Sequence, residues 1–215
     1  MFLLRQRVLR ELRPRLPSSR CISTAQLKVD LAKVRKEKVP KEALTFGTTF
    51  TDHMLEVNWT ADGGWGDPRI MPYQDIRMDP ASSALHYALQ CFEGMKAYID
   101  VEGKTRLFRP EMNMARLSRS MERLCLPSFD QAGFLDCLKE LVNLDKSWIP
   151  EGEGYSLYIR PTAISTHPYL GVGSSSAVKL YARRPHYSAV IASPLVRLHV
   201  SLYVTEFAAR FRVRF

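Results

Sequence analysis

The feature that most constrains the fold is the alternation of strand-like and helix-like runs between Leu44 and residue 178. Residues 53–59 form a short run bounded by an Asp-Gly-Gly turn signal, which is typical of a strand. Residues 112–124 and 134–148 instead repeat their apolar side chains every three or four positions, as amphipathic helices do. Because strands and helices are interleaved and short turns join the strands, the sequence predicts an α+β domain with a mainly antiparallel sheet.

A further helix is predicted over residues 81–93. This run follows Pro80 and spaces Leu85, Leu89 and Phe92 so that they share one helical face. A serine at its start could cap the first turn, because a hydroxyl oxygen can accept a hydrogen bond from a free backbone N–H. The helix is expected to end near Gly94.

Two more segments have the pattern of strands. Residues 95–110 alternate around a turn at 100–103, which predicts a hairpin. Residues 155–161 predict a short strand, and because side chains alternate across a strand, Tyr158 and Arg160 would share one face. The sequence therefore places a phenol hydroxyl and a guanidinium side by side on one surface.

The net charge of +9 is concentrated at the two ends of the chain. Residues 1–28 carry +6 and residues 180–215 carry +5, which leaves −2 for the residues between them. A protein that binds nucleic acid through its folded body needs a basic face there. We therefore expect no nucleic-acid partner, and we interpret residues 179–215 as a basic tail outside the domain.

The first 23 residues are typical of a mitochondrial transit peptide, which predicts the mitochondrial matrix as the location. They are rich in Arg and Ser, contain one acid, and predict an amphipathic basic helix. Arg20-Cys21-Ile22 followed by Ser23 resembles a cleavage site of the matrix protease. A basic surface helix is the alternative interpretation. Residues 24–43 are polar and lysine-rich and are interpreted as a linker.

The distribution of cysteine and histidine does not point to a metal site. The four cysteines show no C-x-x-C pair and no zinc-type spacing, so we expect four free, buried thiols. The five histidines are scattered singly, so no metal is predicted. No run approaches the roughly 18 apolar residues that a membrane-spanning helix needs, so no membrane contact is expected.

Five motifs carry a resemblance to a known family. They are FGTTFTDHML at 46–55, SSALHYALQCFEGMKAY at 82–98, RLFRPEMNMARLSRS at 106–120, LCLPSFD at 124–130 and SLYIRP at 156–161. In this order they closely resemble the branched-chain amino acid aminotransferases of mitochondrial type, over roughly residues 44–178. The resemblance implies the smaller, N-terminal domain of a fold-type IV aminotransferase, in which two domains enclose pyridoxal 5'-phosphate.

The resemblance also implies roles for individual residues. Arg116 would bind the cofactor phosphate, for which a guanidinium is well suited. Tyr158 matches a position in the pocket for the substrate side chain, and Arg160 would hold the substrate carboxylate or orient the Tyr158 hydroxyl. The remaining matches are Phe46, Tyr87 and Phe92 in that same pocket and Leu170 and Val172 near the active site of a partner subunit. A surface arginine and simple core packing are the alternatives.

The implied reaction moves the amino group of leucine, isoleucine or valine to 2-oxoglutarate in a homodimer. Such chemistry needs a lysine amine on the cofactor. In the family this lysine lies well past the SLYIRP segment, whereas the last lysine here is Lys179, and neither it nor Lys96 matches the catalytic position. We therefore expect no catalytic residue in a chain that carries only the small domain. The alternative is a non-catalytic small domain that pairs with full-length subunits and modulates them.

Overall fold

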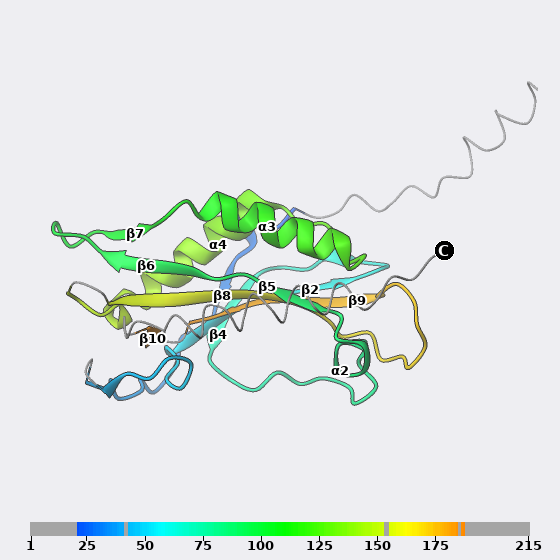
Figure 1. Ribbon diagram of the computed structural model, residues 1–215, viewed down its shortest axis with the longest axis horizontal. Helices are drawn as coiled ribbons and strands as arrows, with labels where there is room; N and C mark the ends of the chain where they lie inside the picture. Colours follow the sequence, from blue (N-terminus) through cyan, green and yellow to red (C-terminus); the bar gives the residue numbers. More distant parts are fainter. Residues whose placement is uncertain (1–20, 41–42, 153–154, 185, 188–215) are drawn as a thin grey trace, which may run out of the picture.

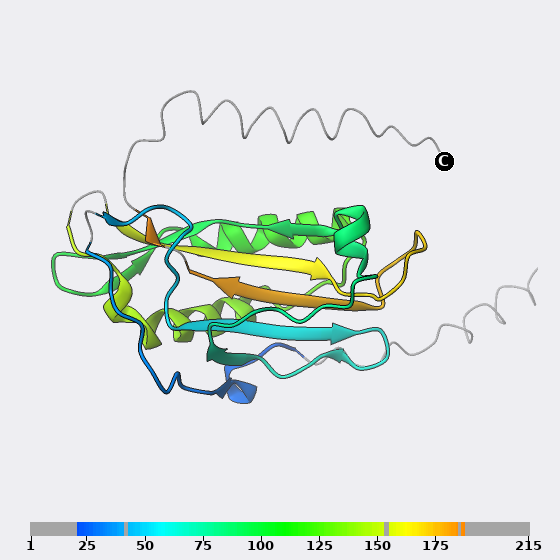
Figure 2. The same ribbon diagram turned by 90° about the horizontal axis from the view of Figure 1, so that it is seen from below.

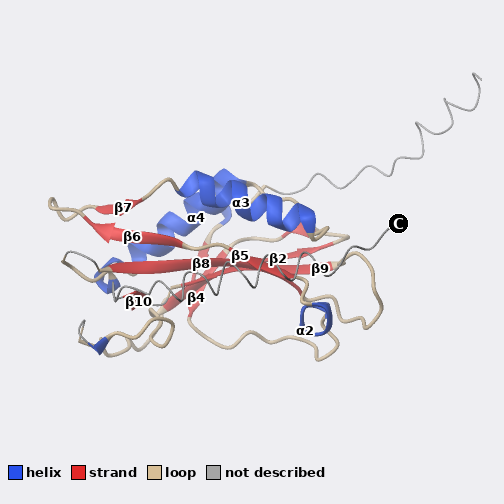
Figure 3. Cartoon of the chain, viewed as in Figure 1, coloured by secondary structure: helices blue, strands red, loops and turns tan. Residues whose placement is uncertain are grey.

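The computed structural model describes residues 21–40, 43–152, 155–184 and 186–187. A sheet forms the centre, two long helices lie together on one face of it, and a short helix lies on the other (Figures 1 and 3). This arrangement confirms the predicted α+β class with a mainly antiparallel sheet.

The elements match many of the predicted segments. The strands are β1 (Lys28–Val29), β2 (His53–Thr60), β3 (Gly64–Trp65), β4 (Arg69–Pro72), β5 (Gln90–Phe92), β6 (Met95–Ile99), β7 (Thr105–Leu107), β8 (Ser156–Ser165), β9 (Ala177–Arg183) and β10 (His186–Tyr187). The helices are α2 (Ser83–Tyr87), α3 (Pro110–Arg123) and α4 (Gln131–Leu144), with 3-10 turns η1 (Thr24–Gln26) and η3 (Lys146–Trp148). The predicted strand at 53–59, the hairpin at 95–110 and the two long helices are confirmed.

The strands follow the order β1-β4-β2-β9-β8-β6-β7 across the sheet. All described pairs are antiparallel except β1 with β4, which is parallel. The ten-residue strand β8 is central, because β9 and β10 pair along one edge of it and β6 and β5 along the other. The strand that carries Tyr158 and Arg160 is therefore supported on both sides.

The two faces of the sheet differ in what covers them. On one face α3 and α4 pack on a large buried cluster that includes Leu157 and Ile159 of β8. The opposite face, seen in Figure 2, carries α2 and a smaller cluster around Ile164. Because side chains alternate along β8, Tyr158 and Arg160 lie on this second face, opposite the face that α3 and α4 cover. We call it the open face.

The long helices begin where the sequence provides suitable residues. Pro110 opens α3, since its missing N–H would have no partner in the first turn anyway. The side chain of Asp130 caps α4 by accepting a hydrogen bond from the N–H of Gly133 at 3.0 Å. Buried residues of both helices at helical spacing, such as Leu117 and Leu138, then form the core with the sheet.

The predicted helix over residues 81–93 is wrong beyond Tyr87. Helix α2 ends there, Ala88 takes the left-handed conformation, and residues 90–92 join the sheet as β5. The apolar spacing on which the prediction depended does not face a core, because Leu85 and Phe92 are 59% and 56% exposed. Pairing with β8 therefore outweighed the helical pattern.

Residues of the sheet lie in the expected linker and beyond the expected end of the domain. The segment 24–43, interpreted as a linker, contains η1 and β1, and Ile22 just before it is buried in the main core. The boundary expected at residue 178 divides β9, which pairs with β2 and β8 up to Arg183. The predicted helix of the first 20 residues and the tail from residue 188 lie outside the described residues. In the described part, no helix is long and apolar enough to cross a membrane.

Candidate functional site

A cavity of about 400 Å³ lies between the start of α3 and strand β6. Arg116 of α3 and Tyr158 of β8 both line it, so the structure brings together the residues predicted for the phosphate and for the amino acid. Two more cationic side chains, Lys96 and Arg109, also line the cavity. This concentration of positive charge suits an anionic ligand.

Arg116 is held by the carboxylate of Glu93, a contact that the sequence did not predict. Its Nε donates to Oε1 of Glu93 at 2.9 Å, and its Nη2 donates to Oε2 at 2.7 Å. This ion pair raises the pKa of Arg116 above its ordinary value through hydrogen bonding to Glu93. The Arg116 side chain remains 48% exposed, so part of the guanidinium faces solvent.

Four predicted site residues meet on the open face. The rings of Phe46 and Tyr158 meet edge to face with centroids 5.3 Å apart. The Arg160 guanidinium lies 4.5 Å from the centroid of the Phe92 ring, and its Nη2 donates to the Tyr158 hydroxyl at 3.4 Å. Two aromatic rings therefore surround a tyrosine and an arginine that can act on one polar group.

Gly94 makes room for the Tyr158 hydroxyl. A Cβ at position 94 would overlap the hydroxyl oxygen and the adjoining ring atoms of Tyr158. A residue with any side chain would therefore displace the tyrosine from its place beside Arg160. The glycine of the EGMKAY segment is explained by this close approach.

The other predicted residues form a separate group. The Tyr87 hydroxyl at the end of α2 donates to the backbone carbonyl of Leu170. Leu170 and Val172 lie in the loop between β8 and β9 and are 57% and 91% exposed. The structure thus joins Tyr87 to this loop rather than to the cluster around Tyr158.

The two lysines considered as substitutes for the catalytic lysine lie in different settings. Lys96 lines the cavity and pairs with Tyr158 in the β6–β8 register. Lys179 is 9% exposed, forms an ion pair with Glu56, and donates to Oδ1 of Asn58 at 2.9 Å. Lys179 is therefore engaged by the sheet.

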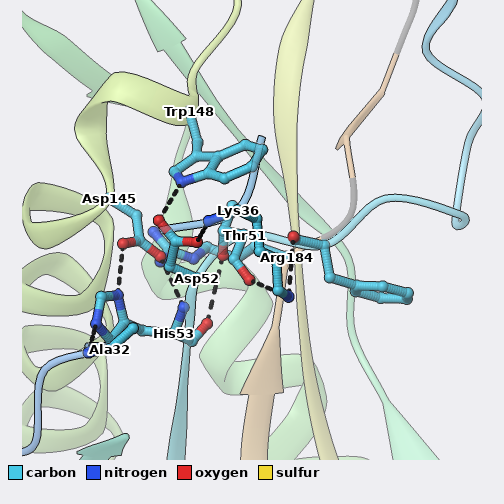
Figure 4. A network of polar contacts seen from close by, with 9 residues as sticks. Ala32, Lys36, Thr51, Asp52, His53, Asp145, Trp148 and Arg184 are labelled. Atoms are coloured by element: carbon cyan, nitrogen blue, oxygen red, sulfur yellow. Dashed lines mark hydrogen bonds and ion pairs between the residues drawn. The ribbon is translucent and has the colours of Figure 1, made fainter. Parts of the chain in front are cut away.

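A second polar cluster is buried beside β2 and the end of α4 (Figure 4). Nε2 of His53 accepts a hydrogen bond from the N–H of Ala32 at 2.9 Å, so Nδ1 carries the proton and donates to Asp145 at 2.7 Å. Arg184, which is fully buried, donates to the other oxygen of Asp145. Burial lowers the pKa of Arg184 to about 10, so it stays protonated at neutral pH.

This cluster fastens the N-terminal segment to the domain. The backbone N–H of Lys36 donates to Asp52 at 2.9 Å, and the Trp148 indole donates to the other oxygen of Asp52, also at 2.9 Å. Its members come from four separate stretches of the chain, so no local pattern could reveal it. The contacts connect backbone segments within the domain, which indicates a structural role. In the described stretches, no three His, Cys, Asp or Glu side chains gather as metal ligands would.

Sequence comparison gives the family. No model of a protein family matches the chain. The mitochondrial branched-chain-amino-acid aminotransferase of Mus musculus is 49% identical over 169 residues, which cover 76% of this chain and 43% of that protein. Branched-chain-amino-acid aminotransferase 2 of Bacillus subtilis is 50% identical over 154 residues, 72% of this chain and 42% of that protein. The chain belongs to the branched-chain-amino-acid aminotransferase family.

The family also has members with other locations and solved structures. The cytosolic branched-chain-amino-acid aminotransferase of Saccharomyces cerevisiae is 42% identical over 189 residues, 86% of this chain and 50% of that protein. The crystal structure of the Escherichia coli enzyme has a TM-score of 0.48 and 18% identity, covering 64% of this chain and 41% of that one. The chain spans half or less of the length of these aminotransferases.

Proposed function

We propose that this chain forms the small-domain side of a pyridoxal 5'-phosphate site in a branched-chain aminotransferase. The observation that carries the proposal is that Arg116 and Tyr158 line one cavity. The residues present suit the cofactor, because Glu93 engages two of the five N–H groups of Arg116 and leaves three for a phosphate. Lys96 and Arg109 add positive charge there. When bound, pyridoxal phosphate supplies an electron sink for amino-group transfer.

On the substrate side, Tyr158 and Arg160 would hold the carboxylate of the amino acid. Phe46 and Phe92 would bound its side chain, because they already contact these two residues. A branched aliphatic side chain offers no hydrogen bonds, so it is selected by apolar shape. The proposed substrates are therefore leucine, isoleucine and valine, with 2-oxoglutarate as the amino acceptor. The lysine amine would come from a part of the fold outside the segment matched here.

Homodimerisation is proposed from the loop between β8 and β9. Its apolar side chains Leu170 and Val172 are exposed, and the Tyr87 hydroxyl binds the loop backbone. In a dimer these two residues would reach the active site of the partner subunit. The same exposure favours the second candidate function, in which this chain pairs with full-length subunits without catalysing the reaction. Co-expression with a tagged full-length relative separates the two candidate functions. Only the second, in which this chain pairs with full-length subunits, predicts a mixed dimer whose aminotransferase activity is reduced.

Mitochondrial matrix localisation is also proposed, with removal of the N-terminal leader. Ile22 is 1% exposed in the main core, so a cleavage that spares the fold would leave Ile22 on the mature chain. Import of the chain into isolated mitochondria followed by N-terminal sequencing tests both statements. Retention outside the organelle would contradict the location, and a mature chain beginning at Thr24 would contradict the role of Ile22.

The phosphate role of Arg116 is tested with pyridoxamine 5'-phosphate and pyridoxamine. Neither has an aldehyde, so neither can react with surface lysines, and they differ only in the phosphate. We expect the chain to bind the phosphorylated compound at least about tenfold more tightly, as a charge-assisted hydrogen bond implies. Arg116→Gln should lower this preference about tenfold, because only Lys96 and Arg109 then remain as cations in the cavity, and Arg119→Gln, on the same helix, should keep it. A preference that Arg116→Gln leaves unchanged would refute the proposal.

A further inference from the structure

We infer that Glu93 is a positioning residue that orients the guanidinium of Arg116 toward a bound phosphate. The inference rests on the proposed function and adds a residue to which no role has been given. Its starting point is that the Glu93 side chain is 12% exposed and both of its oxygens are bonded to α3. A carboxylate removed from water in this way needs such partners.

The bidentate contact fixes the plane of the guanidinium. Nε and Nη2 of Arg116 donate to the two oxygens of Glu93, so rotation about the last side-chain bonds would break one hydrogen bond or both. The three remaining N–H groups belong to Nη1 and to the far side of Nη2. Glu93 therefore holds one edge of the Arg116 guanidinium, and the N–H groups of the other edge point in a fixed direction.

Glu93 is itself held in place. Nδ2 of Asn113 donates to Oε2 of Glu93 at 3.0 Å and to the backbone carbonyl of Gly94 at 2.8 Å. Asn113 and Arg116 are three residues apart on α3 and so lie on one side of the helix. Asn113 is buried, with 7% exposure, so this support is part of the packed domain. The carboxylate is thus a fixed point between the helix and the sheet.

The sheet explains why Glu93 points toward α3. Strands β5 and β6 keep one continuous register on β8, so residues 90–99 alternate as a single extended run. Glu93 falls between Cys91 and Met95, which both face the core under the helices. Its N–H donates to the carbonyl of Pro161 at 3.0 Å, and Pro161 has no N–H to return the bond. An acid therefore occupies a core-facing position at a gap in the ladder.

A carboxylate beside Arg116 could act in two opposite ways. If it positions the guanidinium, its removal weakens phosphate binding, because the arginine must then lose rotational freedom on binding. If it competes with the phosphate for Arg116, its removal strengthens binding. Glu93 leaves three N–H groups of the Arg116 guanidinium for a phosphate, which favours the positioning role.

The test measures the preference of the full chain for pyridoxamine 5'-phosphate over pyridoxamine by ligand fluorescence. Glu93→Gln keeps the size of the side chain but places an amide nitrogen against the guanidinium, so we expect the preference to fall about tenfold. Glu93→Asp keeps the charge but is too short to hold both nitrogens, and should also lower it. Glu122→Gln removes one charge from an exposed position of α3 and should leave the preference unchanged.

Several results would overturn the inference, and they are distinguishable. A preference in Glu93→Gln that equals or exceeds the wild-type value would show that Glu93 does not position Arg116. If Glu93→Gln weakened the binding of both ligands equally, the role of Glu93 would be merely structural. An unchanged preference in Glu93→Asp would show that charge, and not geometry, matters. A wild-type chain without any preference would instead overturn the phosphate role of Arg116, and with it this inference.

Discussion

Arg160 and Arg183 lie directly opposite each other on neighbouring strands β8 and β9. Both side chains are on the open face, and in the part of the chain that the structure describes neither forms an ion pair with a carboxylate. Aromatic rings contact them instead: the Arg160 guanidinium is 4.5 Å from the Phe92 centroid, and that of Arg183 is 5.2 Å from the Tyr181 centroid. Two like charges thus lie side by side on adjacent strands of the same face.

The first prediction concerns this pair. A double-mutant cycle with Arg160→Gln, Arg183→Gln and the double variant should give a coupling that destabilises the fold by about 0.5 kcal/mol at low salt, as for like charges on opposed strand positions. The cycle cancels the ring contacts that each variant loses. The coupling should shrink in 1 M salt, where the Debye length is about 3 Å. Chemical denaturation measures it, and a favourable coupling would contradict the repulsion.

The second prediction concerns the buried ion pair of Arg184 and Asp145. Arg184→Leu should lower the free energy of unfolding by about 3 kcal/mol, because it leaves buried carboxylates without their main cation. Adding Asp145→Asn should recover much of this loss, since an amide oxygen can still accept from Nδ1 of His53. Urea denaturation gives both values. A double variant no more stable than Arg184→Leu would show that charge is not the cause.

The third prediction concerns the cysteines, which were all expected to be buried. Cys21 and Cys125 are exposed, and they should react with a thiol reagent first. Burial raises the pKa of Cys91 and Cys137 to about 11, so at pH 8 about one thiol in a thousand is ionised at either site. Since the thiolate is the reactive form, their rates should rise about tenfold per pH unit below pH 11. Mass spectrometry after timed alkylation identifies the sites, and equal rates at all four would contradict this.

The fourth prediction concerns Gly133 in the first turn of α4. Alanine usually stabilises a helix relative to glycine by about 1 kcal/mol. Here a Cβ would overlap the backbone carbonyl oxygen of Ile22, which cannot move as a flexible side chain can. Gly133→Ala should therefore destabilise the fold by about 2 kcal/mol. Thermal unfolding measures the change, with Gln131→Ala at an exposed position of the same turn as the control.

Much of the fold could be predicted from the sequence, because the long helices and β2 carry clear periodicity. The exception at residues 81–93 has a physical cause. Five residues of helix, a left-handed Ala88 and a three-residue strand have no periodicity of their own. Their structure depends on pairing with β8, which lies about seventy residues further along the chain. Contacts this distant leave no pattern in the local sequence.

The candidate site was predictable in part for the same reason. The shared face of Tyr158 and Arg160 follows from strand alternation, and the place of Arg116 on a helix follows from its periodicity. The carboxylate that holds Arg116 could not be found this way, because Glu93 is 23 residues distant and lies in a run mistaken for helix. A signal was present nonetheless, since an acid between Cys91 and Met95 interrupts an otherwise apolar side of the strand.

Strand β8 presents Leu157 and Ile159 to the helices and Tyr158 and Arg160 to the opposite face. The two pairs share one backbone. A change in the packing of Leu157 or Ile159 that displaces the strand therefore also displaces Tyr158 and Arg160. A cavity-forming change such as Ile159→Ala would therefore shift Tyr158 and Arg160, and with them the selectivity of the proposed substrate site, without any substitution on the open face. The interior packing of this chain and the orientation of Tyr158 and Arg160 are set by the same ten residues.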